Sequence, residues 1–150
     1  MRILAGSNAQ IRYGFEQAMY VMTLDEIRLP WPRRFTNAEA HLATALHELV
    51  HWSGHPDRLH RSFGHRFGDA AYAFEELVAE LGSAFLLGHC GLVDATIEGH
   101  AAYLDSWLKV LKNDRTAIFT AARLAGEAHE FLLSLALPET QDAPASQDDF

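Results

Sequence analysis

The motif His-Glu-Leu-Val-His at residues 47–51 constrains this 150-residue chain more than any other stretch. Residues four apart lie on the same face of a helix, so His47 and His51 can both direct an imidazole at one metal ion. Glu48 lies one position further round the helix, where its carboxylate can reach a water molecule beside the ion. The motif therefore predicts a Zn²⁺-binding helix in which Glu48 is the general base.

The sequence also marks both ends of this helix. Residues 36–39, Thr-Asn-Ala-Glu, have the form of a capping box, which begins a helix. Gly54 is well placed to end the helix, and Pro56 prevents it from continuing. Because the spacing of the motif has a mechanical meaning only on a helix, these ends strengthen the prediction. The apolar stripe expected to face the core is Leu42, Ala45, Leu46 and Leu49.

Short strand-like segments precede this helix, and longer helical segments follow it. Residues 11–13, 18–22 and 26–29 are rich in strand-forming side chains, and two prolines close the last segment. Further helices are predicted from caps at Asp69, at Asp94 and at Asp114. We therefore predict an α+β fold, with a small N-terminal antiparallel sheet followed by about four helices.

Composition limits the class of protein. The length suits one domain with a single core, predicted over residues 1–138, and residues 139–150 form an acidic tail predicted to be disordered. The net charge of −8 argues against nucleic-acid binding, and no apolar run approaches the roughly 20 residues of a membrane span. The single cysteine, Cys90, excludes an internal disulfide and fits a reducing compartment, so we expect a cytoplasmic protein.

A third metal ligand is needed, because a catalytic zinc ion usually has three protein ligands. Glu76 and Glu80 are four apart on the next predicted helix, so both can face the first helix while Glu75 turns away. The gluzincin arrangement uses a glutamate on the next helix as third ligand. A second carboxylate four residues later then binds the far nitrogen of a ligand histidine. Glu76 and Glu80 fit these two roles.

The rival ligand is Asp57, which follows the motif and a glycine at the spacing of a metzincin-like template. In that template the glycine lets the chain turn back toward the metal. Pro56 constrains such an approach, and Glu76 and Glu80 would then be left half-buried without a purpose. Glu76 is therefore the favoured third ligand, Asp57 its main rival and His55 a minor candidate.

Two further residues are candidates for a role in catalysis. His100 and Tyr103 are three apart near the start of the third predicted helix. They could donate hydrogen bonds to an oxyanion as it develops in a hydrolysis reaction. Packing against the neighbouring helices explains the two side chains equally well.

A family resemblance extends these interpretations. The stretch from Ala43 to His55, with Arg58 and Arg61 after it, resembles the zincin-like domain of ArdC-type antirestriction proteins. The same domain forms the C-terminal part of TraC-type plasmid primases and recurs in polyvalent proteins of phages and plasmids. The resemblance covers nearly the whole chain apart from the tail. Further segments that carry it are Tyr20, Asp25, Ile27, Pro30, Phe67–Asp69, Tyr72–Ala73, Glu75–Gly82, Tyr103–Leu104, Ser106–Leu108, Leu111–Lys112, Asp114 and Ala121–Ala122.

The resemblance implies a minimal zincin-like metallopeptidase fold of the gluzincin type, carried on mobile elements and used during conjugation or infection. It also favours Glu76 over Asp57, because the Glu-Glu-Leu-x-Ala-Glu stretch belongs to the family pattern and the position of Asp57 is not fixed in it. Family members usually carry an N-terminal single-stranded-DNA-binding domain, which these 150 residues do not include. We therefore expect a fragment or a stand-alone member that does not itself bind nucleic acid.

Two functions follow from these observations. The first is a zinc metalloendopeptidase, a hydrolase acting on a protein or peptide substrate in antirestriction or conjugation, with no membrane partner. The second is a zinc-stabilised, non-catalytic binding module that contacts restriction enzymes or other DNA-bound proteins. A structural zinc ion needs no Glu48 and usually has four protein ligands. The sequence therefore favours the enzyme.

Overall fold

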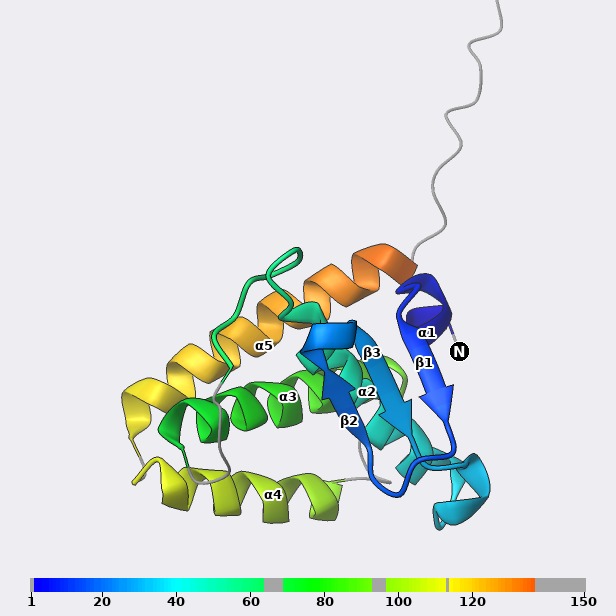
Figure 1. Cartoon of the computed structure of the whole chain (residues 1–150). Coiled ribbons are helices and arrows are strands. Elements are labelled where there is room, and N and C mark those ends of the chain that lie inside the picture. The colour runs from blue at the N-terminus through cyan, green and yellow to red at the C-terminus, as the bar shows by residue number, and fades with distance from the viewer. Residues whose placement is uncertain (1, 64–68, 93–96, 113, 137–150) are drawn as a thin grey trace, which may run out of the picture.

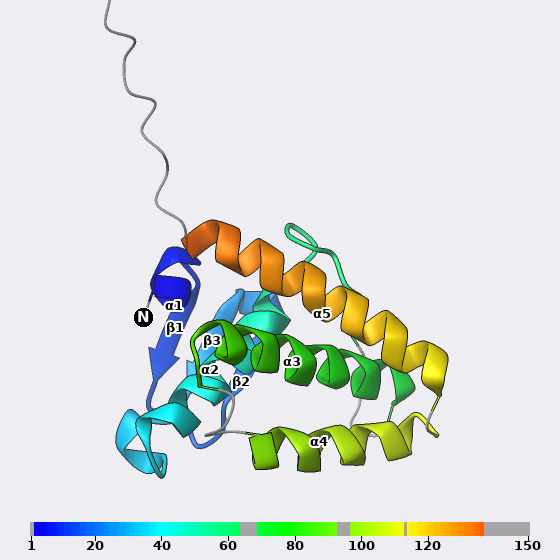
Figure 2. The ribbon, with the colours of Figure 1, turned by 180° about the vertical axis from the view of Figure 1, so that it is seen from behind.

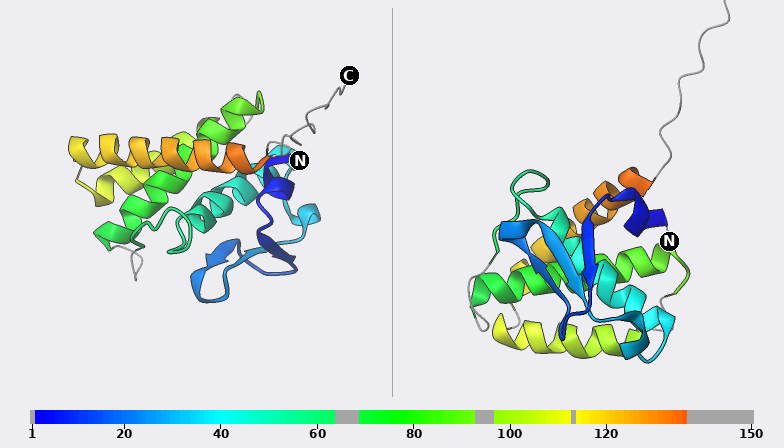
Figure 3. Two further views of the ribbon diagram at one scale, coloured as in Figure 1. Left: turned by 90° about the horizontal axis from the view of Figure 1, so that it is seen from above. Right: turned by 45° about the vertical axis from the view of Figure 1, so that its right-hand side comes forward.

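A small three-stranded sheet and the helices beside it form two distinct parts of the fold (Figure 1, Figure 3). The computed structural model describes residues 2–63, 69–92, 97–112 and 114–136. Among these residues no helix is both long enough and apolar enough to cross a membrane. The elements in chain order are α1 (Arg2–Gly6), β1 (Gln10–Tyr13), β2 (Met19–Val21), β3 (Glu26–Leu29), α2 (Ala38–Ser53), α3 (Ala70–His89), α4 (Ile97–Val110) and α5 (Arg115–Ala136), with short 3-10 turns at Met22–Leu24 and Pro32–Arg34.

The sheet is mixed rather than antiparallel, which corrects one part of the predicted fold. Its strand order is β1-β3-β2, and β3 pairs antiparallel with β2 but parallel with β1. The backbone amides of Gly14 and Phe15 both donate to the carbonyl oxygen of Leu29, at 3.0 and 3.3 Å. These bonds fix the residues that follow β1 to the last residue of β3. The third strand thus lies between the two strands that precede it in the sequence. Ile27 and Leu29 are fully buried, so the most buried of the three strands takes the central position.

The predicted helices are confirmed, and their ends follow from local hydrogen bonds. Asn37 caps α2 by accepting from the amide of Ala40 at 2.7 Å, one residue later than the predicted cap at Thr36. Asp69 caps α3, and Asp114 accepts hydrogen bonds from the first turn of α5. The predicted cap at Asp94 and the tail after residue 136 lie outside the described residues.

Helix α3 is the centre of the helical part, because it packs against α2, α4 and α5 (Figure 2). Helix α2 lies between α3 and the sheet, and contacts β2 and β3. The helices α2 and α3 approach closely at Gly82, where an added Cβ atom would lie 3.0 Å from both Cγ atoms of Val50. Val50 belongs to the HExxH stretch, so this crossing determines how the residues of the two helices face each other.

We predict that Gly82→Val destabilises the fold by crowding this crossing. Overpacking in a core costs about 1–3 kcal/mol, and Val50, which the added atoms would meet, is fully buried. Gly126→Val is the matched control, because Gly126 also lies inside a helix but has open space where its Cβ would be. Denaturant unfolding should show the lower free energy of unfolding for the Gly82 variant. Equal values for the two variants would contradict this explanation of the crossing.

Candidate metal centre

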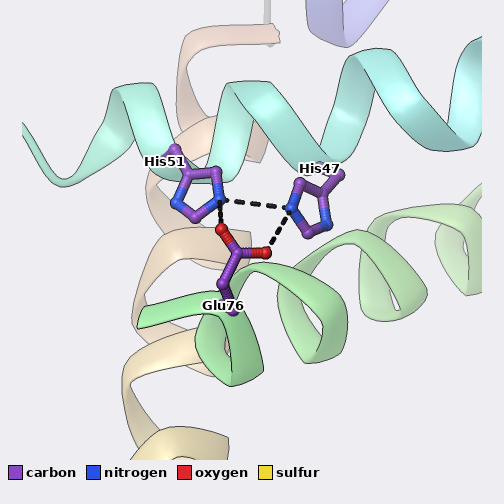
Figure 4. A group of neighbouring side chains, drawn as sticks. All are labelled: His47, His51 and Glu76. Carbon is purple, nitrogen blue, oxygen red and sulfur yellow. Dashed lines mark hydrogen bonds and ion pairs between the residues drawn. The ribbon is translucent and has the colours of Figure 1, made fainter. Parts of the chain in front are cut away.

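The crossing of α2 and α3 brings three potential metal ligands together (Figure 4). Nε2 of His47 lies 3.2 Å from Nε2 of His51. The two carboxylate oxygens of Glu76 each lie 3.2 Å from one of these nitrogens. In the described part of the chain, this is the one group of three or more His, Cys, Asp or Glu side chains whose ligand atoms converge.

The spacing of these atoms suits a divalent metal ion. Zinc ligands bind at about 2.0–2.1 Å, so the ligand atoms of a tetrahedral site lie roughly 3.3 Å apart. The 3.2 Å between the two Nε2 atoms agrees with that edge length, and each of these nitrogens lies 3.2 Å from a different oxygen of Glu76. Two imidazoles and one carboxylate also form a donor set that several divalent ions accept. His47, His51 and Glu76 therefore form a candidate divalent-metal site.

A buried carboxylate supports His51 from behind. Oε1 of Glu75 lies 3.2 Å from Nδ1 of His51, and the guanidinium of Arg61 binds the same carboxylate. A carboxylate only accepts hydrogen bonds, so Nδ1 of His51 carries the proton and Nε2 is free to bind a metal. The prediction that Glu75 turns away is therefore wrong. Glu75 is 3% exposed because the guanidinium of Arg61, from the segment after α2, covers its carboxylate.

His47 has a corresponding support from Glu80. Oε1 of Glu80 lies 3.2 Å from Nδ1 of His47, which is where the predicted supporting role requires it. Oε2 of the same carboxylate lies 2.9 Å from Nδ1 of His100 on α4. His100 therefore contacts the site through Glu80. Its buried Nε2 has no hydrogen-bond partner among the described residues.

The charges at this site depend strongly on one another. Burial lowers the pKa of His51, but hydrogen bonds to Glu75 and Glu76 more than offset this and raise it to about 9. Burial also lowers the pKa of His47, yet Glu76 and Glu80 hold it well above its ordinary value. Burial raises the pKa of Glu76, but the two histidines bring it well below its usual range. Without a metal, the cluster therefore holds protons on its histidines at neutral pH.

The structure places the rival ligands elsewhere. The side chain of Asp57 is 86% exposed, and one of its oxygens lies 3.6 Å from Nδ1 of His55. Gly54 has an ordinary φ of −84°, so the chain does not make the turn for which a metzincin-like template needs glycine. An added Cβ at Gly54 would instead lie 2.7 Å from Phe63 and 2.8 Å from Arg61. Room for these side chains is thus the reason for glycine at this position.

Two cavities lie on either side of the candidate ligands. The larger, about 460 Å³, is lined by His47 and by both predicted oxyanion donors, His100 and Tyr103. The smaller, about 230 Å³, is lined by His51 and by residues of the edge strand β2. Glu48 and Glu76 line both cavities. The site therefore opens in two directions, with the predicted general base at the boundary.

The sequence predicted no role in this site for three of its residues, which are Glu75, Arg61 and Tyr72. Tyr72 lines the smaller cavity, and burial together with the neighbouring Glu76 raises the pKa of its phenol to about 12. It therefore remains a hydrogen-bond donor at neutral pH. Its position one helical turn before Glu76 was the available signal. Arg61 belongs to the segments that carry the family resemblance, but no helical or strand period in residues 55–63 indicates that its side chain is buried.

A helix that carries HExxH, a glutamate on the following helix and a small sheet beside them define a zincin-like metallopeptidase fold. The comparison with protein families agrees, because a model described as a zincin-like metallopeptidase matches residues 1–124. The chain belongs to this family.

The curated relatives are longer proteins. The chain is 42% identical to the DNA primase TraC of Escherichia coli over 146 residues. This alignment covers 97% of the chain and 14% of the primase. It is 40% identical over 131 residues to the uncharacterized protein y4eC of Sinorhizobium fredii, which is 87% of this chain and 43% of the relative. The chain thus spans less than half the length of either relative.

Solved structures share the fold. The Mn(II)-bound antirestriction protein ArdC from plasmid R388 matches with a TM-score of 0.76 and 39% identity, over 92% of this chain and 52% of that protein. Its metal-free structure matches with a TM-score of 0.71 and 40% identity, over 90% and 49% respectively. The resemblance to ArdC and TraC proteins that the sequence indicated is therefore confirmed.

The third ligand can be tested by removing its carboxylate. We predict that Glu76→Ala weakens binding of Zn²⁺ by more than the roughly 10–100-fold that loss of a supporting partner costs. Asp57→Ala should bind like the parent, since Asp57 is exposed and paired with His55. Titration against a chromophoric chelator measures both affinities. Equal retention of the ion by Glu76→Ala and the parent would disprove the assignment.

Metal binding should also release protons. Because the pKa of His51 is about 9, this ring is protonated in the metal-free chain at about pH 8, and the raised pKa of His47 acts in the same direction. Binding one ion should therefore release at least about one proton. Calorimetry in buffers of different protonation enthalpy measures this number. Ordinary histidines would release almost no protons on metal binding at about pH 8.

The proton on His51 also stabilises the metal-free fold. This contribution is fully present below pH 6.5 and is lost as pH rises through about 9.

Proposed function

We propose that this domain is a metal-dependent endopeptidase, with Zn²⁺ as its ion, which hydrolyses peptide bonds of a protein substrate. The observation that carries this proposal is the position of Glu48, which lines both cavities beside the candidate ligands. A divalent ion bound there would supply a Lewis acid that polarises a carbonyl group and makes a water molecule more acidic. The antirestriction activity in the name of ArdC links the proposal to the entry of plasmid or phage DNA.

Glu48 is suited to move protons in this reaction. Glu48 is only 7% exposed, yet it lines both of the cavities beside His47 and His51. We assign it the acceptance of a proton from the attacking water and the transfer of that proton to the leaving amine nitrogen. A structural metal site would have no use for a carboxylate in this position.

Donors around the larger cavity would bind the carbonyl oxygen as it gains negative charge. His100 and Tyr103 both line this cavity, and His100 has its Nδ1 directed at Glu80. Its buried Nε2 could donate to such an oxygen only if the ring carried a second proton and a substrate reached that atom. Tyr72, on the opposite side, lines the smaller cavity with a protonated phenol that hydrogen-bonds Glu76, and it would have to exchange that partner for a substrate oxygen. These three side chains are our candidates for oxyanion donors.

The edge strand β2 is our candidate for substrate alignment. One edge of β2 pairs with β3 and the opposite edge lies at the border of the sheet. Residues 18–20 line the smaller cavity. An extended peptide can add to a free strand edge through main-chain hydrogen bonds. Such pairing would place a peptide bond beside Glu48.

A non-catalytic binding module is the second candidate function. The observation that favours it is the candidate triad itself, which connects α2 to α3 and would stabilise their crossing when it binds a metal. In that case the domain would contact restriction enzymes or other DNA-bound proteins, and hydrolysis would play no part. We propose protein rather than nucleic acid as the partner, in keeping with the net charge of −8.

We predict that Glu48→Gln separates these two functions. The amide cannot accept the proton, so cleavage should fall by about 10²–10⁴-fold, while metal binding stays at the level of the parent. Protein fragments that accumulate with the parent and not with the variant would identify the substrate. The measurement pairs metal content with mass spectrometry of the fragments. Antirestriction or cleavage that survives in the metal-loaded variant would exclude the hydrolytic mechanism.

A further inference from the structure

The segment that follows α2 places a charged side chain inside the protein, next to the metal centre. Arg61 is 8% exposed, and its guanidinium is surrounded by acceptors. Its Nε donates to Glu75 at 3.0 Å and its Nη2 donates to the other oxygen at 2.9 Å. The remaining donors bind the hydroxyl of Ser53 at 3.1 Å and the carbonyl oxygen of Val50. This guanidinium therefore connects α3 to the last turn of α2.

Stability alone does not explain this buried pair. Transferring two charges from water into a protein costs several kcal/mol, and a buried ion pair often contributes no more stability than apolar residues of the same volume. The Glu75–Arg61 pair has a further contact, because Oε1 of Glu75 also lies 3.2 Å from Nδ1 of His51. Arg61 contacts no candidate ligand in the described structure except through this carboxylate.

We propose that Arg61 is a positioning residue of the metal centre, which fixes the carboxylate of Glu75 so that Glu75 fixes the ring of His51. This inference rests on the proposed metal site. The forked guanidinium holds both oxygens of Glu75 and restricts its rotation. The ring of His51 then keeps its proton on Nδ1 and presents Nε2 toward His47 and Glu76. The segment after α2 thus contributes to metal affinity without supplying a ligand.

The backbone of this segment is folded to place Arg61. The amide of Leu59 donates to the carbonyl of Ser53, and the amide of Arg61 donates to that of Gly54, both at 3.0 Å. His60 between them has a φ of 51°, a left-handed conformation that turns the chain back over the end of α2. Gly54 leaves room for the guanidinium, as an added Cβ there would lie 2.8 Å from it.

A simpler role has to be distinguished from this one. A cation that binds a carbonyl in the last turn of a helix stabilises that helix, and Arg61 does so at Val50. In that role Arg61 would affect the folding of the domain but would not act through Glu75. The two roles differ in how the effects of changing Arg61 and Glu75 combine.

A double-mutant cycle on metal affinity tests the proposal. The affinity of the whole chain for Zn²⁺, and for Mn²⁺ as a second probe, is measured by competition with a chromophoric chelator. Arg61→Met and Glu75→Gln should each weaken binding about 10–100-fold. The double variant should bind no more weakly than the weaker single variant, because Arg61 acts through Glu75. An unchanged affinity in Arg61→Met overturns the proposal, and so does an equal loss in the parent and Glu75→Gln backgrounds.

Arg58→Met is the matched control. Arg58 lies in the same segment and binds Asp25 and the carbonyl of Trp52, and among the described residues its hydrogen bonds reach neither Glu75 nor His51. It should lower stability and leave metal affinity at the parent level, with the Co²⁺-loaded absorption spectrum unchanged. Arg61→Met and Glu75→Gln should both change that spectrum. An equal effect of Arg58→Met on affinity would show that segment stability, rather than positioning, is responsible.

A conservative variant covers the case in which Arg61→Met does not fold. Arg61→Lys keeps the charge but loses the fork, so it should fold and bind metal more weakly than the parent. Parent-level affinity in Arg61→Lys, with an unfolded Arg61→Met, would overturn the positioning role. A parent chain that binds neither Zn²⁺ nor Mn²⁺ would instead overturn the proposed metal site, and the present inference with it.

Discussion

Ionisable side chains buried at the crossing of α2 and α3 are the constraint on which the rest of this structure depends. Three glutamates of α3 and two histidines of α2 lie in an interface that apolar contacts would otherwise fill. Each carboxylate is tolerated because a basic group binds it, either an imidazole or the guanidinium of Arg61. The tight contact between Gly82 and Val50 keeps the two helices close enough for these pairs to form. The fold therefore holds an arrangement of charges that a metal ion can complete.

The same arrangement bears on both candidate functions. In the endopeptidase, the supports of the ligand histidines fix the ligands, while Glu48 and the cavities on either side act on the substrate. In the binding module, only the connection between α2 and α3 is needed, and the cavities have no assigned role. Membership of the zincin-like metallopeptidase family and the Mn(II)-bound ArdC structure agree with metal binding in either case. The two cavities and the position of Glu48 are what favour the enzyme.

Local patterns predicted most of the helical part. The caps at Asp69 and Asp114 and the end of α2 near Gly54 could be identified because each depends on a few neighbouring residues. The relation between Glu76 and Glu80 follows from the helical period. The sheet was harder, since the place of β1 beside β3 depends on hydrogen bonds between distant segments. Glu75 was misplaced for a similar reason, because helical spacing shows its direction but not that residues 59–63 cover it.

Gly54 and Arg61 occupy adjoining space and should therefore change together in evolution. The glycine has an ordinary backbone conformation, so its value lies in the space that the guanidinium and the ring of Phe63 occupy. A side chain at position 54 would take space that the guanidinium of Arg61 now occupies, so the loss of the glycine leaves the arginine less room inside the protein. Changes at the two positions should therefore accompany each other as related chains diverge. Correlated substitution at positions 54 and 61 would then indicate which related chains keep the same support of the metal centre, although neither residue is a candidate metal ligand.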